Sequence, residues 1–511
     1  MKFLRALRNV VLLSALLLLV FSTVSAQGGG TLRVGVNAPV VLDPALHSAD
    51  TEIALNRAIY DYLVEVLPDS SIGPNLATDW TVSDDGLTYT FNLVQGVTFH
   101  DGSAFSSADV VWTFNRLKEL QSPAVNLLGD FEVSAPDENT VVFTLASVNA
   151  DFLFGVGARQ ALIVQDGQDA PNVIGADGSL TSFNGTGPFV LQSFDPGVSA
   201  VLVRNENYWQ EGAPVLDELD FVYMDDQSAQ VDALLGGQVD FIFRLRSEDV
   251  ARLEGNADIT VLQESTSLHG VIRLRTDEGS LGEDVRVRQA LKYATDREAL
   301  NELVAEGRGT VGNNDPIAPV FSQYYDDSIE NQTYDPAMAC QLLTDAGQNP
   351  LTTTLFYPIA LDFEALATVL QQQWAETGCI NVELQGVTEN LYYDSSNPDN
   401  WLGAQLGITG WSAQPTPQTE LVQAFTIDGI YNETHWSDEE LDALINEASQ
   451  TPDTDARSAI YAQISQIFLE RGPIIIPYFQ PTVGAASVSV EGVELAPFPG
   501  LTDYRTASMS G

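Results

Sequence analysis

The chain has 511 residues, which is more than one hydrophobic core can organise, so we expect two or three lobes. Apolar residues make up 44% and charged residues 18% of the sequence, a balance typical of a folded globular protein rather than a disordered one. Acidic residues outnumber basic ones by 70 to 22, and the net charge of −48 excludes nucleic acid and anionic lipid surfaces as expected partners.

The first 26 residues have the three parts of a secretory signal peptide. Basic residues open the chain, residues 10–21 are apolar, and residues 24–26 read Val-Ser-Ala, which places small residues at a cleavage site. The apolar run is too short for a membrane span. Because no cysteine lies directly after that run, where a lipid would be attached, no lipid anchor is expected after cleavage near Ala26. We therefore expect an exported protein that is soluble in the periplasm or the extracellular space.

Strands and helices alternate along the remaining chain. Alternating apolar residues predict strands over 31–37, 89–93, 140–145, 201–204, 219–223, 239–243, 259–263, 353–357, 382–385 and 474–478. Helix starts are signalled by Ser106 with Asp109 three residues later, and by Asp335 followed by proline. Apolar stripes predict further helices, over 363–374, 437–448 and 460–468. This alternation indicates an α/β fold class.

The sequence lacks the usual signatures of catalysis and of metal binding. No lysine follows a glycine, which excludes a Walker A loop, and H-E-x-x-H, C-x-x-C and G-x-S-x-G are all absent. Cys340 and Cys379 are too few for a structural zinc site, and in an oxidising compartment such a pair favours a disulfide over two buried free thiols. We therefore expect no catalytic residues, no metal and no cofactor, and predict a Cys340–Cys379 disulfide.

Motifs in four stretches keep the order and spacing of one protein family. The first stretch reads TLRVG at 31–35, LDP at 42–44 and IYDYL at 59–63. The second reads PNLA at 74–77, DGLTYTF at 85–91, FHDG at 99–102 and ADVV at 108–111. The third reads GTGPF at 185–189, RNENYW at 204–209 and ALLGGQVD at 233–240, and the fourth reads DVRVRQAL at 284–291. Together they resemble family 5 of the extracellular solute-binding proteins, the peptide- and nickel-type proteins that serve ABC importers.

The resemblance implies a two-lobed, periplasmic-binding-protein-like fold with a hinge and an interlobe ligand cleft. Lobe I would hold residues 31–274 with the C-terminal tail 487–511, and lobe II would hold residues 275–486. The hinge segments would lie near 269–276 and 478–487. A monomer would close on a small ligand and then dock on the permease subunits of an importer.

One segment departs from the peptide-binding members of this family. Those members carry Gly-Trp, two small residues and then an Asp that pairs with the α-ammonium of the ligand. The corresponding residues here are Gly410, Trp411, Ser412, Ala413 and Gln414. A buried ammonium needs an opposite charge, which Gln414 lacks, whereas a glutamine can donate to and accept from a neutral, hydroxyl-rich ligand. Trp411 would then offer an apolar face to a sugar ring or an aliphatic chain.

The alternative for this segment is that Trp411 belongs to the core and that another carboxylate replaces the missing Asp. The candidates are Glu389, Asp394 and Asp399. Arg244 and Arg246 follow a predicted strand and could hold a ligand carboxylate, with ordinary salt bridges as the alternative. His47 follows Asp43 and Pro44 in a loop that the resemblance places near the cleft.

The sequence thus predicts an extracytoplasmic substrate-binding protein of an ABC importer, which is not an enzyme. It would capture an oligopeptide-like or other small solute by closure of two lobes. A neutral oligosaccharide-binding member of the same family is one alternative. An exported hydrolase, whose acidic pair would be hidden among 70 carboxylates, is the alternative from another class.

Overall fold

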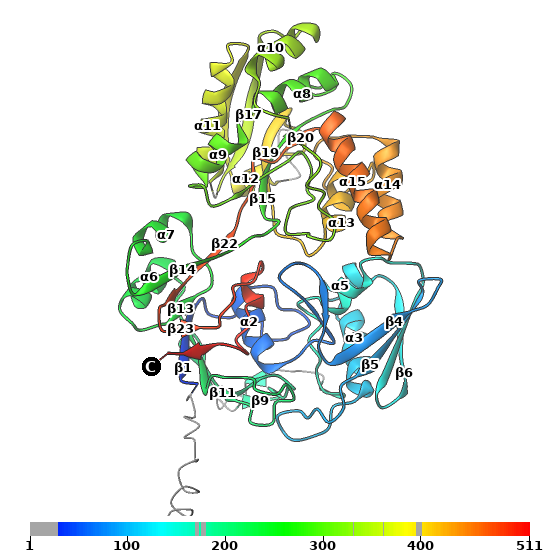
Figure 1. Ribbon diagram of the computed structural model, residues 1–511, viewed down its shortest axis with the longest axis vertical. Coiled ribbons are helices and arrows are strands. Elements are labelled where there is room, and N and C mark those ends of the chain that lie inside the picture. Colours follow the sequence, from blue (N-terminus) through cyan, green and yellow to red (C-terminus); the bar gives the residue numbers. More distant parts are fainter. Residues whose placement is uncertain are drawn as a thin grey trace, which may run out of the picture.

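The computed structural model in Figure 1 describes residues 29–168, 173–174, 180–330, 332–360, 362–394 and 401–510. The predicted signal peptide lies outside these residues. Two lobes lie one above the other in this view, and few segments pass between them. The lower one, here called lobe I, contains the C-terminal end, and the upper one is here called lobe II.

Lobe I is built on a seven-stranded sheet in the order β10-β11-β12-β1-β13-β22-β14. The strands are β1 (Thr31–Val36), β10 (Phe189–Asp195), β11 (Ser199–Arg204), β12 (Glu218–Tyr223), β13 (Phe241–Ile242), β14 (Ile259–Glu264) and β22 (Thr482–Ser487). Its helices are α2 (Asp50–Ile59), α6 (Gln227–Leu235) and α7 (Ser247–Leu253). β1 runs parallel to both β12 and β13, so the carboxyl ends of these three strands share one edge of the sheet.

A second, four-stranded sheet flanks this core in lobe I, in the order β4-β5-β7-β6. Its elements are β4 (Ala77–Val82), β5 (Thr88–Leu93), β6 (Phe131–Asp137), β7 (Thr140–Leu145), α3 (Ser107–Glu119), α4 (Val125–Leu128) and α5 (Phe152–Val156). The predicted capping box at the start of α3 is confirmed, since the backbone N–H of Ser106 donates to Asp109 at 2.7 Å. Phe114 of α3 then packs on Phe143 of β7, with ring centroids 4.8 Å apart.

Lobe II is built on a sheet in the order β16-β21-β15-β19-β17-β18, to which β20 adds beside β15. The strands are β15 (His269–Leu274), β16 (Thr310–Val311), β17 (Leu351–Ile359), β18 (Ile380–Thr388), β19 (Leu406–Trp411), β20 (Ile474–Ile475) and β21 (Tyr478–Phe479). The helices are α8 (Val285–Tyr293), α9 (Arg297–Val304), α10 (Pro336–Asp345), α11 (Phe363–Glu376), α12 (Glu389–Tyr392), α13 (Pro417–Glu420), η1 (Leu421–Phe425), α14 (Glu439–Ser449) and α15 (Thr454–Arg471).

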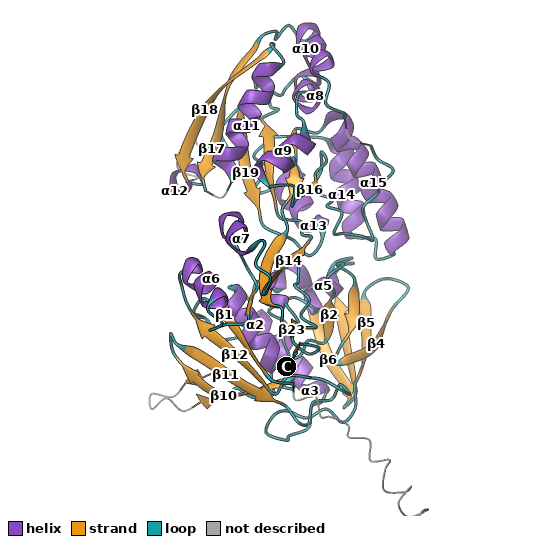
Figure 2. Ribbon diagram, turned by 60° about the vertical axis from the view of Figure 1, so that its left-hand side comes forward, coloured by secondary structure: helices purple, strands orange, loops and turns teal. Residues whose placement is uncertain are grey.

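Helices cover both faces of the lobe II sheet, and Figure 2 shows α14 and α15 on the side away from β17 and β18. Ile272 of β15 packs into the core formed with α8 to α11, whereas its neighbour Val271 packs into the core formed with α14 and α15. All six residues of β15 are therefore buried. The predicted disulfide is present, joining Cys340 of α10 to Cys379 just before β18, with the Cα atoms 5.6 Å apart.

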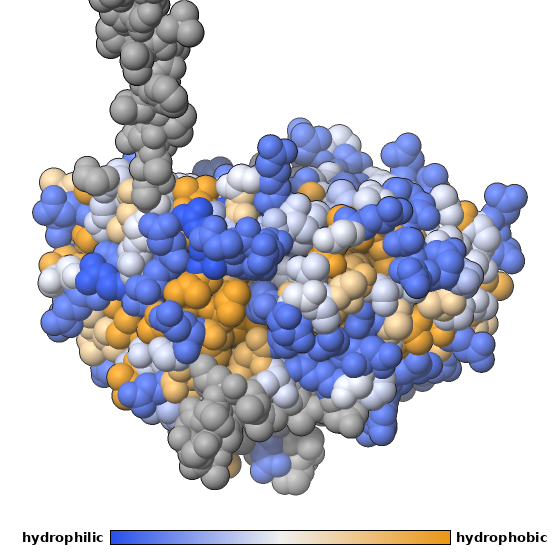
Figure 3. Space-filling view, turned by 90° about the horizontal axis from the view of Figure 1, so that it is seen from below, coloured by the Kyte–Doolittle hydropathy of each residue, from blue (hydrophilic) through white to orange (hydrophobic). Residues whose placement is uncertain are grey.

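Short elements complete the described chain. They are β2 (Val64–Val66), β3 (Ile72–Pro74), β8 (Val173–Ile174), β9 (Leu180–Thr181), β23 (Val490–Glu491), β24 (Ser508–Met509) and the 3-10 turn η2 (Pro499–Leu501). The face of lobe I seen in Figure 3 carries hydrophilic side chains interspersed with apolar patches. Within the ranges that the structure describes, no helix has the length and apolar character needed to cross a bilayer.

The α/β fold class and the two-lobed architecture are confirmed, but strand pairing moves the lobe boundaries. β15 pairs with β19 over all six of its residues, so 269–274 belongs to lobe II. β22 pairs with β13 and β14, so 482–487 belongs to lobe I. The predicted boundaries at 274 and 487 are therefore wrong by one strand each, because an apolar run does not reveal which sheet it joins. The strand predicted over 474–478 is likewise divided into β20 and β21.

Candidate functional site

A cavity of about 1680 Å³ lies between the two lobes and is lined by residues of both. On the lobe I side it begins at the shared edge where β1, β12 and β13 end, marked by Asn37, Asp225 and Arg244. On the lobe II side it is lined by the loop after β19 and by α13 and η1. Open α/β sheets bind ligands outside the carboxyl ends of parallel strands, and this cavity has that position.

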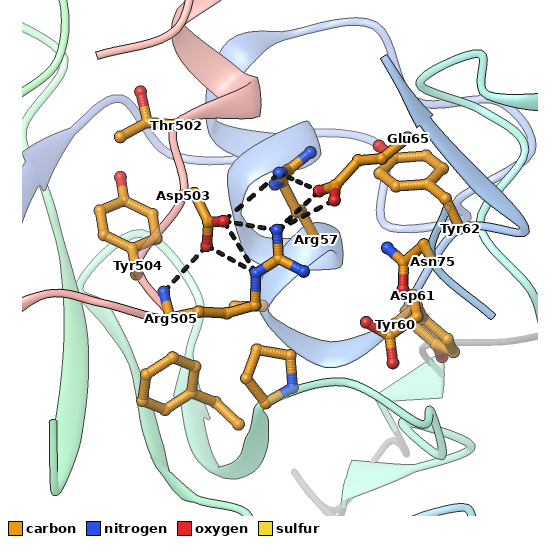
Figure 4. Close-up of a pocket in the computed structure, with 13 residues that line it drawn as sticks. Arg57, Tyr60, Asp61, Tyr62, Glu65, Asn75, Thr502, Asp503, Tyr504 and Arg505 are labelled. Carbon is orange, nitrogen blue, oxygen red and sulfur yellow. Dashed lines mark hydrogen bonds and ion pairs between the residues drawn. The ribbon is translucent and has the colours of Figure 1, made fainter. Parts of the chain in front are cut away.

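Figure 4 shows a second, much smaller pocket of about 20 Å³ inside lobe I. Arg505 contacts Glu65 at 2.9 Å, and Arg57 contacts the same carboxylate from α2. Asp61 accepts hydrogen bonds from Tyr208 and from Trp209, both at 3.0 Å. A space that holds about one water molecule cannot hold a solute. This cluster joins the C-terminal segment to the rest of lobe I, so the interlobe cavity is the candidate ligand site.

Two short segments pass between the lobes at the cavity. Residues 265–268 connect β14 to β15, and residues 480–481 connect β21 to β22. The Thr266 hydroxyl donates to the Gln480 carbonyl at 2.6 Å, and the backbone N–H of Gln480 donates to the Leu268 carbonyl at 2.7 Å. The first crossing thus precedes the hinge segment predicted near 269–276, most of which is strand β15. The second crossing lies inside the hinge segment predicted near 478–487.

The predicted segment after β19 does reach the cavity, through Ser412, Ala413 and Gln414. The backbone N–H of Gln414 donates to the Ser267 hydroxyl at 2.8 Å, and that hydroxyl donates back to the Gln414 carbonyl at 3.2 Å. The Gln414 side chain amide donates to the Ser412 carbonyl at 3.2 Å. The crossing segment therefore fixes the backbone of Gln414, and its side chain is held at the cavity wall.

Trp411 and Gly410 belong to the core rather than to the cavity. Trp411 is only 8% exposed, packs in the core with α14 and α15, and has its ring 6.1 Å from that of Tyr431. A Cβ at Gly410 would lie 2.9 Å from the ring of Phe363, so glycine allows β19 to approach α11. Both are absent from the cavity wall. A strand covered on both faces buries the tryptophan, so the structure does not support the ligand-binding predictions for these two residues, which stay predictions.

The prediction that His47 binds ligand also finds no support in the structure. His47 is fully buried, and it does not line the cavity. Its Nδ1 accepts from the Asn56 amide at 2.9 Å, and its Nε2 donates to the Arg159 carbonyl at 2.7 Å. Burial lowers the pKa of His47 to about 4, which keeps the ring neutral near pH 7. His47 therefore holds two parts of lobe I together.

Arg244 and Arg246 both line the cavity and both have acidic partners. Arg244 lies 3.3 Å from Asp50, and Arg246 lies 3.0 Å from Asp249. Their side chains are 63% and 55% exposed, so each guanidinium also has a solvent-facing side. The location agrees with the ligand-binding interpretation and the contacts agree with the salt-bridge interpretation, so the ligand role of both residues stays a prediction.

Sequence reasoning missed most of the cavity wall. Amide side chains are its commonest polar groups: Asn37, Asn126, Asn149, Gln160, Gln227, Gln230, Gln414, Gln418, Gln423 and Gln480. Charged residues outside the prediction also line it: Asp50, Asp151, Asp225, Asp226, Asp362, Arg159 and Arg308. Only those that come within two residues of the end of a predicted strand, such as Asp225 after 219–223, carried a usable signal.

Two of the three proposed substitutes for the missing carboxylate do not line the cavity. Glu389 and Asp394 do not line the cavity, and Asp399 lies outside the described residues. No histidine, tyrosine, tryptophan, cysteine, methionine or lysine is among the described residues that line the cavity. Within the described ranges, no group of three His, Cys, Asp or Glu side chains is arranged to hold a metal ion.

Comparisons with known proteins agree along most of the chain. The family model for bacterial extracellular solute-binding proteins, family 5, matches residues 71–432. The chain is 30% identical to the Heme-binding protein A of Haemophilus influenzae, over 93% of this chain and 91% of that protein. It is 26% identical to the Di/tripeptide-binding protein 1 of Pseudomonas aeruginosa, over 98% of this chain and 99% of that protein. The structure of HbpA2 from Haemophilus parasuis superposes with a TM-score of 0.81 and 26% identity, covering 94% of this chain and all of that one.

Proposed function

The chain belongs to family 5 of the bacterial extracellular solute-binding proteins, and from this membership we propose that it captures an oligopeptide-like solute for an ABC importer. The observation that carries the proposal is the interlobe cavity of about 1680 Å³, whose wall comes from both lobes. The protein would work without catalysis, as an exported monomer that delivers its ligand to permease subunits. Relatives named for di- and tripeptides span nearly the whole chain.

The chemistry of the wall favours a peptide-like ligand. Amide side chains both donate and accept hydrogen bonds, so they can pair with the peptide bonds of many different sequences. Phe154, Phe243 and Phe498 add apolar surface for the side chains of such a ligand. The wall therefore combines sequence-tolerant polar groups with apolar patches, which suits a mixture of short peptides.

Two rival ligands find less support in the described wall. Haem is usually held by an axial histidine, cysteine, methionine or tyrosine, and none of these lines the cavity in the described ranges. An oligosaccharide would use a tryptophan or tyrosine face, but Trp411 is buried in the core. These observations place a peptide-like solute before the neutral oligosaccharide and before the haem named for one relative.

We propose that binding works by closure of the lobes about the two crossing segments, 265–268 and 480–481. Lobe I would comprise residues 29–264 with 482–510, and lobe II would comprise residues 269–479. A ligand that touches both walls favours the closed state by its differential affinity for that state. The cavity exceeds the roughly 300–1,000 Å³ of a typical ligand pocket, so there is room for the walls to approach.

The test is native mass spectrometry of the mature protein purified without denaturation. We expect a stoichiometric, unmodified ligand that appears as a heterogeneous ladder of short peptides. A matched sample that is unfolded in guanidinium, dialysed and refolded should show only the mass of the chain. A single haem or glycan mass would refute the peptide assignment, and a ligand recovered in hydrolysed form would support the hydrolase instead.

A further inference from the structure

One arginine at the interlobe cavity lacks the ion pair that its counterparts have. Arg159 lines the cavity from lobe I, in the loop after α5, and it is exposed. No ion pair or side-chain hydrogen bond of its guanidinium is present in the described chain. Of the seventeen arginines in the described ranges, fourteen lie within 4.0 Å of an Asp or Glu.

The other two exceptions differ from Arg159 in being buried and hydrogen-bonded. Arg288 donates to the Gly282 carbonyl at 2.5 Å, and Arg297 donates to Asn314 at 2.6 Å. Arg159 is therefore the one exposed arginine of the described chain that has no carboxylate partner. A protein with 70 acidic residues has many carboxylates available, so this lack of pairing needs a cause.

Two carboxylates that raise the pKa of His47 are already engaged with other groups. These are Asp43 and Glu52, and the His47 ring bonds the Arg159 carbonyl. Asp43 pairs with Arg116, which donates to both of its oxygens. Glu52 accepts four backbone N–H groups, two at each oxygen, over distances of 2.6 to 3.0 Å. Both carboxylates are therefore already satisfied by partners other than Arg159.

The backbone at Arg159 is held firmly while its guanidinium stays free. The Arg159 carbonyl accepts from His47 at 2.7 Å and from the Tyr62 hydroxyl at 3.3 Å. The next side chain, that of Gln160, is buried and donates to the His47 carbonyl at 3.0 Å. Because the backbone of Arg159 is already fixed, a bound ligand has to order only the arginine side chain. Binding groups are pre-organised in this way.

We infer that Arg159 is a subsite for a carboxylate of the ligand. A guanidinium matches a carboxylate with two parallel N–H···O bonds, and such charge-assisted bonds are stronger than neutral ones. The opposite wall offers the uncharged Gln414 where a ligand ammonium would need a carboxylate. The ligand class is thus an acidic solute, whose carboxylate lies on lobe I and whose neutral part faces Gln414. This inference rests on the proposed function in taking the interlobe cavity as the ligand site.

The test compares two pools of tetrapeptides that differ only at the carboxyl end, as free acids or as amides. We expect the wild type to bind the free acids about 10- to 100-fold more tightly, as a charged hydrogen bond would give. Arg159→Gln should lose this preference, and Arg159→Lys should keep part of it. The control is Arg252→Gln, which removes the same charge from an exposed residue outside the cavity. A free-acid preference that survives in Arg159→Gln overturns the inference.

Failure of the peptide assignment can be separated from failure of this subsite. If neither pool binds the wild type, the peptide proposal is wrong, and the small-molecule extract of the purified protein becomes the probe. Half of that extract is methyl-esterified, and both halves are rebound to emptied wild type and to Arg159→Gln. Esterification should weaken rebinding to the wild type and leave the variant unaffected. Equal rebinding of both halves to the wild type would overturn the carboxylate subsite.

Discussion

A buried ion pair between the lobes gives the sharpest test of the energetics. Asp151 of lobe I and Arg457 of α15 in lobe II lie 2.7 Å apart, and Asp151 also accepts from the Thr416 hydroxyl at 3.2 Å. The Arg457 side chain is 1% exposed and lies 5.3 Å from the rings of Tyr324 and Tyr461. The perturbation is Asp151→Asn, which keeps the shape and an acceptor for Thr416 but removes the charge.

The expected magnitude follows from the burial of Arg457. Burial opposes the charge of Arg457, whereas Asp151 raises its pKa. Without Asp151 the guanidinium still keeps its proton, because arginine is effectively always protonated in proteins. Removing one partner of a buried pair costs about 3–5 kcal/mol, because the other charge stays in the interior without compensation. An exposed pair is worth only about 0–1 kcal/mol. The matched control is therefore Asp232→Asn, whose partner Arg252 is 41% exposed.

The assay is urea unfolding at pH 7, followed by circular dichroism, for the wild type and the single variants Asp151→Asn, Asp232→Asn and Arg457→Met. We also expect the double variant Asp151→Asn with Arg457→Met to lose less free energy of unfolding than the sum of its single losses, because no buried charge remains alone. If Asp151→Asn loses no more than Asp232→Asn, the reasoning from burial is refuted.

Further predictions concern pH, specificity, oxidation and the stability of the empty protein. Because burial lowers the pKa of His47 to about 4, the unfolded chain binds a proton below pH ~6.5 that the native state does not, so stability should fall by about 3 kcal/mol from pH 6.5 to 4. His47→Gln should flatten this fall in urea unfolding measured across that range. Gln414→Asp should make peptides with a free amino end bind about tenfold more tightly than their N-acetylated forms. Replacing Cys340 and Cys379 by alanine should cost up to about 4 kcal/mol, from the 39-residue separation that the disulfide closes.

Each of these predictions has an outcome that contradicts it. Equal pH dependence for wild type and His47→Gln would mean that another group governs the acid loss. Equal affinity of Gln414→Asp for both peptide forms would remove residue 414 from the amine end of the ligand. Gln414→Ala should leave the stability of the empty protein unchanged, since Ser267 holds the backbone. Two titratable thiols in the denatured, unreduced protein would exclude the disulfide.

Local features were predicted well because neighbouring residues produce them. The capping box of Ser106 and Asp109 needs only three residues of chain, and it starts α3 as expected. Asp335 with its following proline starts α10 in the same way. One local detail differed, since Asp438 rather than Ser437 caps α14. Both residue types cap helices, so the sequence did not distinguish between them.

Residues that depend on distant partners were predicted poorly. His47 looked like a cleft residue because it follows a family motif, but Asn56 and the Arg159 carbonyl hold it in the interior. Trp411 looked like a ligand platform because of its neighbours in sequence. Its burial depends on α14 and α15, which come later in the chain. Arg159 attracted no attention, since an unpaired charge is visible only once every other partner is known.

The sequence by itself determined the α/β class, the family resemblance, the helix ends and the lack of catalytic motifs. These depend on spacing and residue type over short distances. Only the tertiary structure decided which sheet β15 and β22 join, and which side chains share the cavity. Ser267 and Gln414, which are 147 residues apart, meet at one wall, and Asp151 meets Arg457 across the lobes. Contacts between such distant residues depend on how whole sheets and their covering helices pack, and a local sequence pattern does not specify that packing.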